Sequence, residues 1–533
     1  MGKILRNIVG TAMLKENYYR EPTDTDRLVF EKLVPPDHYL RRVKDLIDFE
    51  AFRGFVRDAY SSDQGRPAVD PILLIKIEFL EFHYGLSDRE VIAEAQVNVA
   101  FRYFLDLSLE SRLPVPSLLS QFRTRLGEER HQAIFDELVR QAREHGLVKD
   151  RLRLKDSTHV VANVAVPSTL VLVAQVRQRL LKALQPYAPE RVEEEEKEAA
   201  TIRKATVDLK DKERLARRVA HLRKIVAWAD ELASALGPVP EKGDRKRQAL
   251  EQALELAHKV LADRDDPKAS GRVRSAVDPD ARRGKHGDYY DGYKLDVLVD
   301  ADSEIITALE VLPGNGDEAA DSEVLLRHEE EVHGNDVVEL SVDGIISNRG
   351  KVLRSLEDPR GLGVTVYAPP PSETNSGGYF SSDQFTLDQQ EEVLTCPAGQ
   401  QTRNRYPNSN GTGWRFSFRR SQCRDCPLLH QCMAELPAKR GRMVYKNSYQ
   451  AEYDRLRARS QTKRYQEVRR EHPKVERKLS EVVQRHVGRR TRYRGRWRVK
   501  IQYLLLGIVV NVKRMVKQLY QKAPAAGFYM AGT

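Results

Sequence analysis

All four cysteines of the chain lie in one short stretch of its second half. Cys396 precedes the pair Cys423 and Cys426, and Cys432 follows that pair after five more residues. Four thiolates suit tetrahedral Zn²⁺, and two cysteines separated by two residues are typical of a zinc knuckle. We therefore predict a structural Zn²⁺ site at these four positions, with His430 as an alternative ligand. Reduced thiols without a metal are the simpler alternative.

A second group of candidates consists of three acidic residues that are far apart in the sequence. Asp156 lies near the end of an expected strand, Asp343 ends another, and Glu476 lies on an expected late helix. Three carboxylates that meet on folding can hold two divalent cations about 3.5–4 Å apart, an arrangement suited to phosphoryl transfer. The chain has 78 acidic residues, so the pattern alone does not single out these three. Glu471 and Glu481 are alternatives for the third acid.

Strands and helices alternate around the first two acids. Apolar runs and period-two alternation predict a short buried strand at 152–154 and further strands at 293–299, 305–312, 336–342 and 363–367. Helical patterns cover 318–331, 351–356 and 449–520. Without the inserts, this order is that of a ribonuclease-H-like α/β core with a mixed sheet.

The same patterns divide the chain into regions. Before the core, a series of helices at 71–126 begins with an apolar helix ending near Gly85, followed by a capping box at Ser87 and Glu90. Such a series is compatible with a DNA-reading helix–turn–helix or with a plain helical bundle. Residues 193–236 favour a charged helical hairpin, and 265–287 a polar loop. The predicted regions are a 1–36 irregular arm, a 37–148 helical DNA-binding domain, a core at 149–167 and 287–370, a 168–286 charged helical insert, a 371–445 cysteine-rich zinc insert, and a 446–533 basic helical part of the catalytic domain.

The charge of the chain is distributed unevenly. The net charge is +11, yet residues 401–533 alone hold 32 lysines and arginines against 8 acidic residues. Such a block attracts polyanions and releases counterions from phosphates, which predicts nucleic-acid binding. In 490–498, arginines alternate with Tyr493 and Trp497, a mixture suited to phosphate contact and base stacking. A solvated basic face is the alternative. The arginines expected to contact DNA here are Arg489, Arg490, Arg492, Arg494 and Arg498.

Two classes of protein fit the composition poorly. No apolar run approaches the roughly 18 residues that a membrane-spanning helix needs. The first ten residues are too short and too quickly polar for a secretory signal, and four cysteines in 533 residues do not make a disulfide scaffold. We therefore expect a cytoplasmic protein without a membrane partner.

Taken together, several motifs resemble those of bacterial insertion-sequence transposases of the DDE type, in the branch with a helical N-terminal domain and a cysteine-bearing insert. The combination is specific although each motif alone is weak. The stretches that carry the resemblance are 155–163, 292–294 with 313–315, 342–347, and 475–477 with 492–495 and 511–514.

The resemblance implies a ribonuclease-H-like catalytic domain in which Asp156, Asp343 and Glu476 bind Mg²⁺ or Mn²⁺. It implies cleavage of double-stranded DNA at transposon ends and transfer of those ends to target DNA, that is, DNA recombination. Because two ends are cut, a homo-oligomer is expected, with 168–264 as a candidate contact.

The chain also departs from the family pattern. Ile346 stands where an aromatic residue often follows the second aspartate, and Val483 stands where a lysine commonly follows the glutamate. We expect Arg485 to contact phosphate in place of that lysine. Two other functions stay open: a catalytically inactive, transposase-derived DNA-binding protein, and a metal-dependent DNA nuclease without strand transfer.

Overall fold

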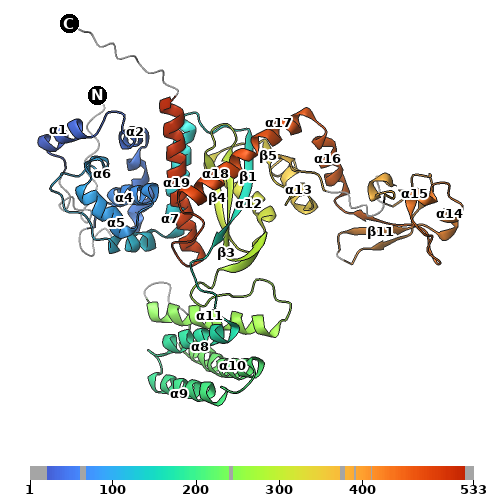
Figure 1. Cartoon of the computed structure of the whole chain (residues 1–533), viewed down its shortest axis with the longest axis horizontal. Helices are drawn as coiled ribbons and strands as arrows, with labels where there is room; N and C mark the ends of the chain where they lie inside the picture. Colours follow the sequence, from blue (N-terminus) through green and yellow to red (C-terminus); the bar gives the residue numbers. More distant parts are fainter. Residues whose placement is uncertain are drawn as a thin grey trace, which may run out of the picture.

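The computed structural model describes residues 21–60, 68–238, 244–371, 378–388, 392–409 and 411–521. A mixed α/β core lies at the centre of the molecule, with the N-terminal helices beside it (Figure 1). A helical insert extends below the core in this view, and the cysteine-rich insert lies at the end opposite the N-terminal helices. Residues 1–20 of the expected arm lie outside the described residues.

The region before the sheet is helical, as expected. The capping box at Ser87 and Glu90 starts α5, and Gly85 ends α4 in the left-handed conformation. The expectation of an irregular arm through residue 36 is wrong, because Thr23 and Asp26 form another capping box and start α1. The helices are α1 (Asp24–Leu33), α2 (Tyr39–Leu46), α3 (Arg53–Val56), α4 (Pro71–Tyr84), α5 (Asp88–Val97), α6 (Val99–Phe104) and α7 (Ser117–Glu144), with 3₁₀ turns at Phe49–Phe52 and Arg57–Ala59.

The central sheet is mixed. Its strands are β1 (Leu152–Val161), β2 (Arg282–His286), β3 (Asp288–Asp300), β4 (Ile306–Pro313), β5 (Glu339–Ser341) and β6 (Thr365–Tyr367). They lie in the order β4-β3-β1-β5-β6, with β2 on the first part of β3. The pairs β1–β5 and β5–β6 are parallel, and β3 is antiparallel to its neighbours. The loop expected at 265–287 is wrong for β2, which forms because β3 extends past the end of β4 and leaves that edge open at 288–292.

Helices cover both faces of this sheet. The odd-numbered residues of β3 from Tyr293 to Val299 join one hydrophobic core with the N-terminal helices, α18 (Pro473–Ser480) and α19 (Arg496–Gln521). Leu298 faces the other way, into a core with α12 (Glu318–His333), α13 (Gly350–Glu357) and α16 (Gln450–Ser460). The period-two pattern of the strand therefore sorts its side chains between two helical layers.

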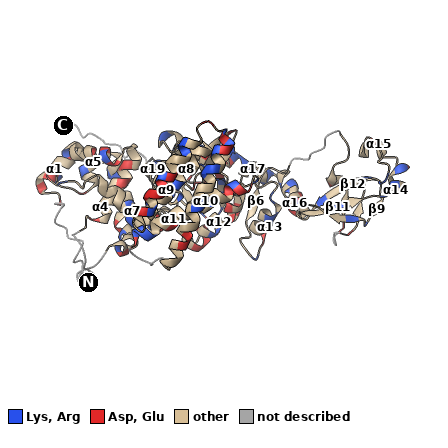
Figure 2. Ribbon diagram, turned by 90° about the horizontal axis from the view of Figure 1, so that it is seen from below, with Lys and Arg blue, Asp and Glu red and all other residues tan. Residues whose placement is uncertain are grey.

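Two inserts have cores of their own. Helices α8 (Thr169–Leu184), α9 (Pro189–Ala205), α10 (Asp211–Ala235) and α11 (Arg245–Asp265) form the first, and acidic and basic residues are both spread along its helices (Figure 2). The second insert has a small core around Phe385, Phe416 and Phe418. Its elements are β7 (Thr386–Leu387), β8 (Leu394–Thr395), β9 (Gln401–Thr402), β10 (Arg405–Pro407), β11 (Gly413–Ser417), β12 (Met443–Asn447), α14 (Arg420–Arg424) and α15 (Leu429–Cys432), with a 3₁₀ turn at Ser382–Gln384.

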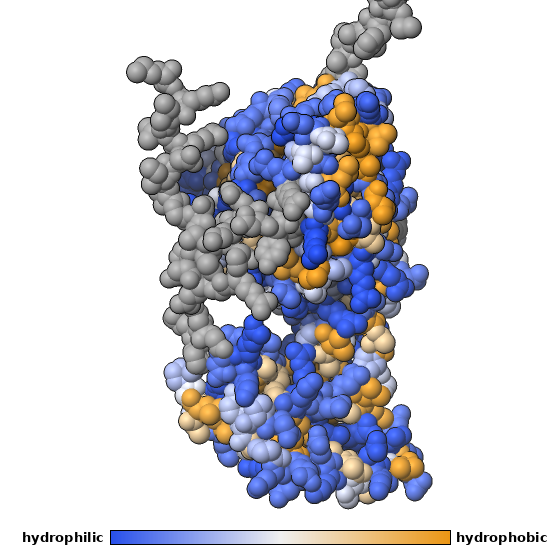
Figure 3. Space-filling view, turned by 90° about the vertical axis from the view of Figure 1, so that its left-hand side faces the viewer, coloured by the Kyte–Doolittle hydropathy of each residue, from blue (hydrophilic) through white to orange (hydrophobic). Residues whose placement is uncertain are grey.

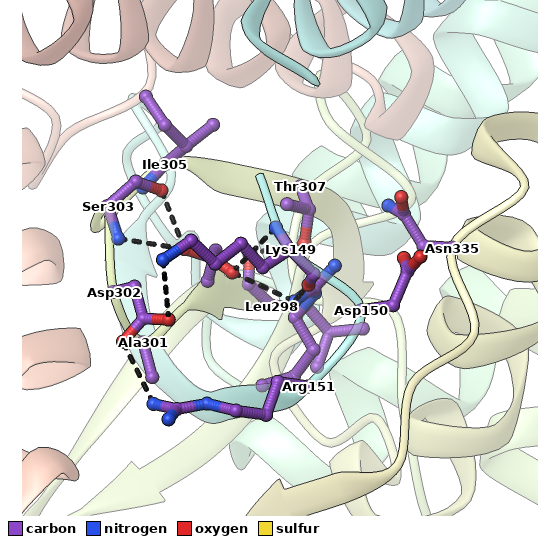
Figure 4. A network of polar contacts seen from close by, with 12 residues as sticks. Lys149, Asp150, Arg151, Leu298, Ala301, Asp302, Ser303, Ile305, Thr307 and Asn335 are labelled. Carbon is purple, nitrogen blue, oxygen red and sulfur yellow. Dashed lines mark hydrogen bonds and ion pairs between the residues drawn. The ribbon is translucent and has the colours of Figure 1, made fainter. Parts of the chain in front are cut away.

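Polar contacts fix the start of β1 against its neighbours. Lys149 and Arg151 both pair with Asp302 in the turn after β3 (Figure 4). The next charged residue, Arg153, is fully buried and pairs with Asp300 of β3 and Glu329 of α12. Buried charges without partners are strongly destabilising, so these contacts favour one register of β1.

The surface is mainly polar on the side formed by the N-terminal helices and the helical insert, with separate apolar patches (Figure 3). Among the described residues, none of the helices combines the length and the apolar character needed to cross a bilayer.

Candidate active site

The parallel pairing of β1 with β5 brings two of the predicted acids together. The last residues paired across these strands are Leu154 and Ser341, and Asp156 and Asp343 each follow two positions later. Because side chains alternate along a strand, Asp156 shares the sheet face of Leu154. The strand is longer than expected, because its antiparallel pairing with β3 continues to Val161. Asp156 therefore lies inside β1.

Helix α18 places the third predicted acid above this face. Val475 and Leu479 enter the same hydrophobic core as Leu154. Just before the helix, His472 is buried, and its Nδ1 lies 3.1 Å from Ser341 Oγ on β5. The apolar side of α18 is thereby held on the sheet, and Glu476 stays exposed at its first turn.

The electrostatics of Asp156 reflect this convergence. Burial raises the pKa of Asp156 to about 7, and the nearby charges of Asp343 and Glu476 add to the rise, against a hydrogen bond from the Ser157 amide. In the described chain these three carboxylates do not all lie within 4.8 Å of one another. The donor set fits Mg²⁺ or Mn²⁺, because these cations take carboxylate oxygens and would offset the mutual repulsion.

The two alternative third acids are already neutralised by lysines. Glu471 pairs with Lys474. Glu481 pairs with Lys478 at 3.1 Å and with Lys513 at 3.0 Å; burial raises the pKa of Glu481, but these lysines outweigh it and lower the pKa overall. No described residue forms a hydrogen bond or ion pair with Glu476, so its carboxylate is available to a ligand.

Sequence reasoning missed a fourth acid, Glu318. This first residue of α12 lines a small pocket together with Asp156 and Asp343. Its carboxylate accepts a hydrogen bond from Ser157 Oγ and pairs with Lys294 Nζ at 3.0 Å. Lys294 lies in a stretch that carried the family resemblance, but nothing in the sequence indicated that it faces Glu318.

The four cysteines line one cavity of the second insert, beside Arg442. Burial raises the pKa of Cys432, and the neighbouring thiols of Cys423, Cys396 and Cys426 add to the rise against Arg442. In the described residues no three of these sulfur atoms lie within 4.8 Å of one another, so a tetrahedral site would require side-chain rotation. His430, the alternative ligand, is exposed and does not line the cavity.

The basic segment before α19, residues 489–495, lies against β1. Backbone hydrogen bonds join Val161 of β1 to Arg489 at 2.9 Å and to Thr491 at 3.0 Å. The guanidinium group of Arg489 donates to Thr158 Oγ1 and to the His159 carbonyl. The segment thus follows the strand that carries Asp156.

Only some of the predicted DNA-contacting residues are free to bind DNA. Arg492 pairs with buried Glu81 at 3.2 Å and lies over the Phe82 ring. The guanidinium group of Arg123 lies over the Tyr493 ring in a cation–π contact. Arg492 therefore holds the segment onto α4 and Tyr493 holds it onto α7, contrary to the expectation that they face DNA. The arginines that are exposed are Arg485, Arg490, Arg494 and Arg498.

The 71–126 helices fit either a DNA-reading helix–turn–helix or a plain bundle, and α4 itself is not positioned to read DNA. From Pro71 to Phe82 every residue of α4 is buried, because α3, α5, α7, α19 and the 3₁₀ turn at Phe49–Phe52 pack around it. A helix enclosed on all sides cannot enter a DNA groove.

Two family profiles match the chain. The profile described as "Transposase domain (DUF772)" matches residues 28–125, and the profile described as "Transposase DDE domain" matches residues 395–516. The first match covers α2–α6 with parts of α1 and α7, and the second covers the cysteines and Glu476, whereas Asp156 and Asp343 lie between the two. Comparisons with curated proteins and with solved structures gave no match.

These matches confirm the resemblance to insertion-sequence transposases of the DDE type and support a transposase function.

Proposed function

We propose that this protein is a transposase that binds transposon ends and catalyses metal-dependent DNA cleavage and strand transfer. The observation that carries the proposal is the convergence of Asp156, Asp343 and Glu476 from two parallel strands and a covering helix. The order β4-β3-β1-β5-β6, with β3 antiparallel to its neighbours, supports a ribonuclease-H-like core.

In this proposal Asp156, Asp343 and Glu476 hold Mg²⁺ or Mn²⁺ ions, which when bound supply Lewis-acid charge stabilisation for phosphoryl transfer. Asp156 must lose its proton to serve as a ligand, so its raised pKa makes the site dependent on pH near neutrality. Glu318 and Lys294 would hold the pocket wall through their ion pair.

Double-stranded DNA would lie along the basic segment that borders β1. Exposed Arg485, Arg490, Arg494 and Arg498 would contact phosphates, while Arg489 and Arg492 fix the segment in place. Since cutting two ends requires two sites, we propose a homo-oligomer, with the helical insert as a candidate contact.

The second insert would be a structural zinc module. Its hydrophobic core is small, and metal binding contributes folding free energy to modules of this kind. We assign Cys396, Cys423, Cys426 and Cys432 as its ligands because all four line one cavity.

The proposal is tested with the purified full-length chain and DNA carrying the inverted repeats that should flank its coding region. Incubation with Mg²⁺ should yield cut ends whose 3′-hydroxyls become joined to a target plasmid. Binding without cleavage would favour the inactive DNA-binding derivative, and cleavage without joining would favour the nuclease.

A further inference from the structure

Two histidines and an aspartate meet where the C-terminal end of α12 contacts α7. His328 Nε2 lies 3.0 Å from Asp136 Oδ1, and His333 Nε2 lies 3.4 Å from the same oxygen. All three donor atoms fall within 4.8 Å of one another. The two imidazole rings are 5.3 Å apart and stand at 84°, so they approach the carboxylate from different directions.

These distances suit a metal ion. Bonds of 2.0–2.1 Å from nitrogen and oxygen to a tetrahedral Zn²⁺ separate neighbouring donors by about 3.3 Å. The two observed separations, 3.0 and 3.4 Å, bracket that value. Each histidine is therefore already at ligand spacing from Asp136 Oδ1, and the two histidine nitrogens lie within 4.8 Å of each other.

Protein contacts alone leave this cluster incomplete. The His333 side chain is only 2% exposed, yet its Nε2 atom has no hydrogen-bond partner. Buried polar atoms are seldom left without partners, so each exception calls for an explanation. The unpartnered nitrogen points toward the oxygen that His328 also contacts, and a cation bound between them would satisfy both rings.

The carboxylate is held in place for such a role. Gln132 Nε2 donates to Asp136 Oδ1 at 3.0 Å from one turn earlier in α7, the kind of supporting contact that orients metal ligands.

We propose that Asp136, His328 and His333 form a second metal site, which binds a divalent transition metal ion of the zinc class and joins α7 to α12. Two imidazoles and one carboxylate suit zinc better than magnesium. A water molecule completes the coordination beside His328, the most exposed of the three side chains at 26%. Since α12 begins at Glu318 in the active-site pocket, the ion fixes the far end of the helix that forms the pocket wall.

The helical insert contains a comparison site without these properties. Glu195, Glu198 and His221 also converge, but Lys224 lies 3.1 Å from Glu195 and 2.5 Å from Glu198. The lysine already supplies the positive charge, and His221 Nε2 has Glu195 as a partner at 2.9 Å. His221→Gln is therefore a matched control.

The test measures bound metal on the full-length chain, stripped with a chelator, loaded with a small excess of Zn²⁺ and desalted. His333→Gln, Asp136→Asn and His328→Gln should each retain one zinc fewer than the wild type, whereas His221→Gln should retain the wild-type number. Loading with Co²⁺ separates this site from the cysteines, because a site without thiolates gives no thiolate charge-transfer absorption. Any such absorption should therefore be the same in all five proteins.

Thermal unfolding gives a second readout that does not depend on activity. Zn²⁺ should raise the unfolding temperature of the wild type more than that of the three variants. His328→Gln, at the most exposed position, keeps the test valid if substitution of buried His333 prevents folding. Equal zinc content and equal stabilisation in the wild type and in folded His328→Gln would overturn the proposal.

Discussion

Asp156 and Asp343 each lie two residues beyond Leu154 and Ser341, the last pair joined across two parallel strands. The relationship explains how residues 187 positions apart in the sequence come to share a site. It also explains why the pKa of Asp156 is raised to about 7, first by burial and then by the charges of Asp343 and Glu476.

The raised pKa predicts that Asp156→Asn stabilises the metal-free protein at pH 8. An acid whose pKa is raised in the folded state lowers the stability of the protein when it ionises. For Asp156 this loss of stability is complete above pH 7 and absent below the pKa range of ordinary carboxyl groups. The gain in unfolding free energy should be about 1–3 kcal/mol at pH 8. Urea unfolding with a chelator at pH 8 and pH 4 checks it, and an equal gain at both pH values would rule out ionisation of Asp156 as the cause.

We expect one zinc ion per chain at the cysteines, and Cys423→Ser should release it. Loss of a thiolate ligand should destabilise the second insert, whose own core is small. Metal analysis, together with limited proteolysis of the insert, measures both effects. If no zinc is found and all four thiols of the folded protein react freely, the site does not exist.

Salt dependence should identify the arginines that contact DNA. On duplex DNA, each phosphate contact contributes about −0.9 to the slope of log binding constant against log salt concentration. Replacing exposed Arg490, Arg494 and Arg498 with alanine should therefore reduce the magnitude of the slope by about one to three units. It should also weaken binding to DNA of every sequence to the same extent. Fluorescence anisotropy across a salt series measures the slope. An unchanged slope with lost sequence preference would mean that this segment reads bases.

Arg492→Ala should act on stability instead. It removes a partner of buried Glu81, whose pKa is raised to about 8 by burial even with Arg123 and Arg492 beside it. A loss of about 1–3 kcal/mol in unfolding free energy is expected. Exposed Arg498→Ala serves as the control and should change stability little. A larger loss of stability in Arg498→Ala than in Arg492→Ala would contradict the structural role of Arg492 and favour a role in DNA contact.

The local parts of this architecture could be predicted from the sequence, because strand alternation and helix caps are local signals. The alternation from Tyr293 to Val299 correctly indicated a strand, which the structure shows as part of β3. The contact partners could not be predicted in the same way. Arg492 looks like a DNA ligand until folding brings it to Glu81, and the sequence of α4 does not show which helices enclose it.

The third acid shows the same limit. Glu471, Glu476 and Glu481 differ little in sequence context, and the family resemblance was needed to choose among them. In the structure the lysine partners of Glu471 and Glu481 separate them from exposed Glu476. Glu318 was missed because its role depends on Lys294 and Ser157, which only the folded sheet brings near it.

The central claim is that Asp156, Asp343 and Glu476 together bind the catalytic metal ions. The most direct measurement is Mg²⁺-dependent cleavage of transposon-end DNA by Glu476→Gln, with Glu471→Gln and Glu481→Gln as matched controls and DNA binding measured in parallel. Removing a metal ligand removes charge stabilisation in the transition state, so Glu476→Gln should cut no DNA while binding it within a few fold of the wild type. Both controls should still cleave. Full cleavage by Glu476→Gln, with loss of activity in either control, would contradict the assignment of Glu476 as the third metal ligand.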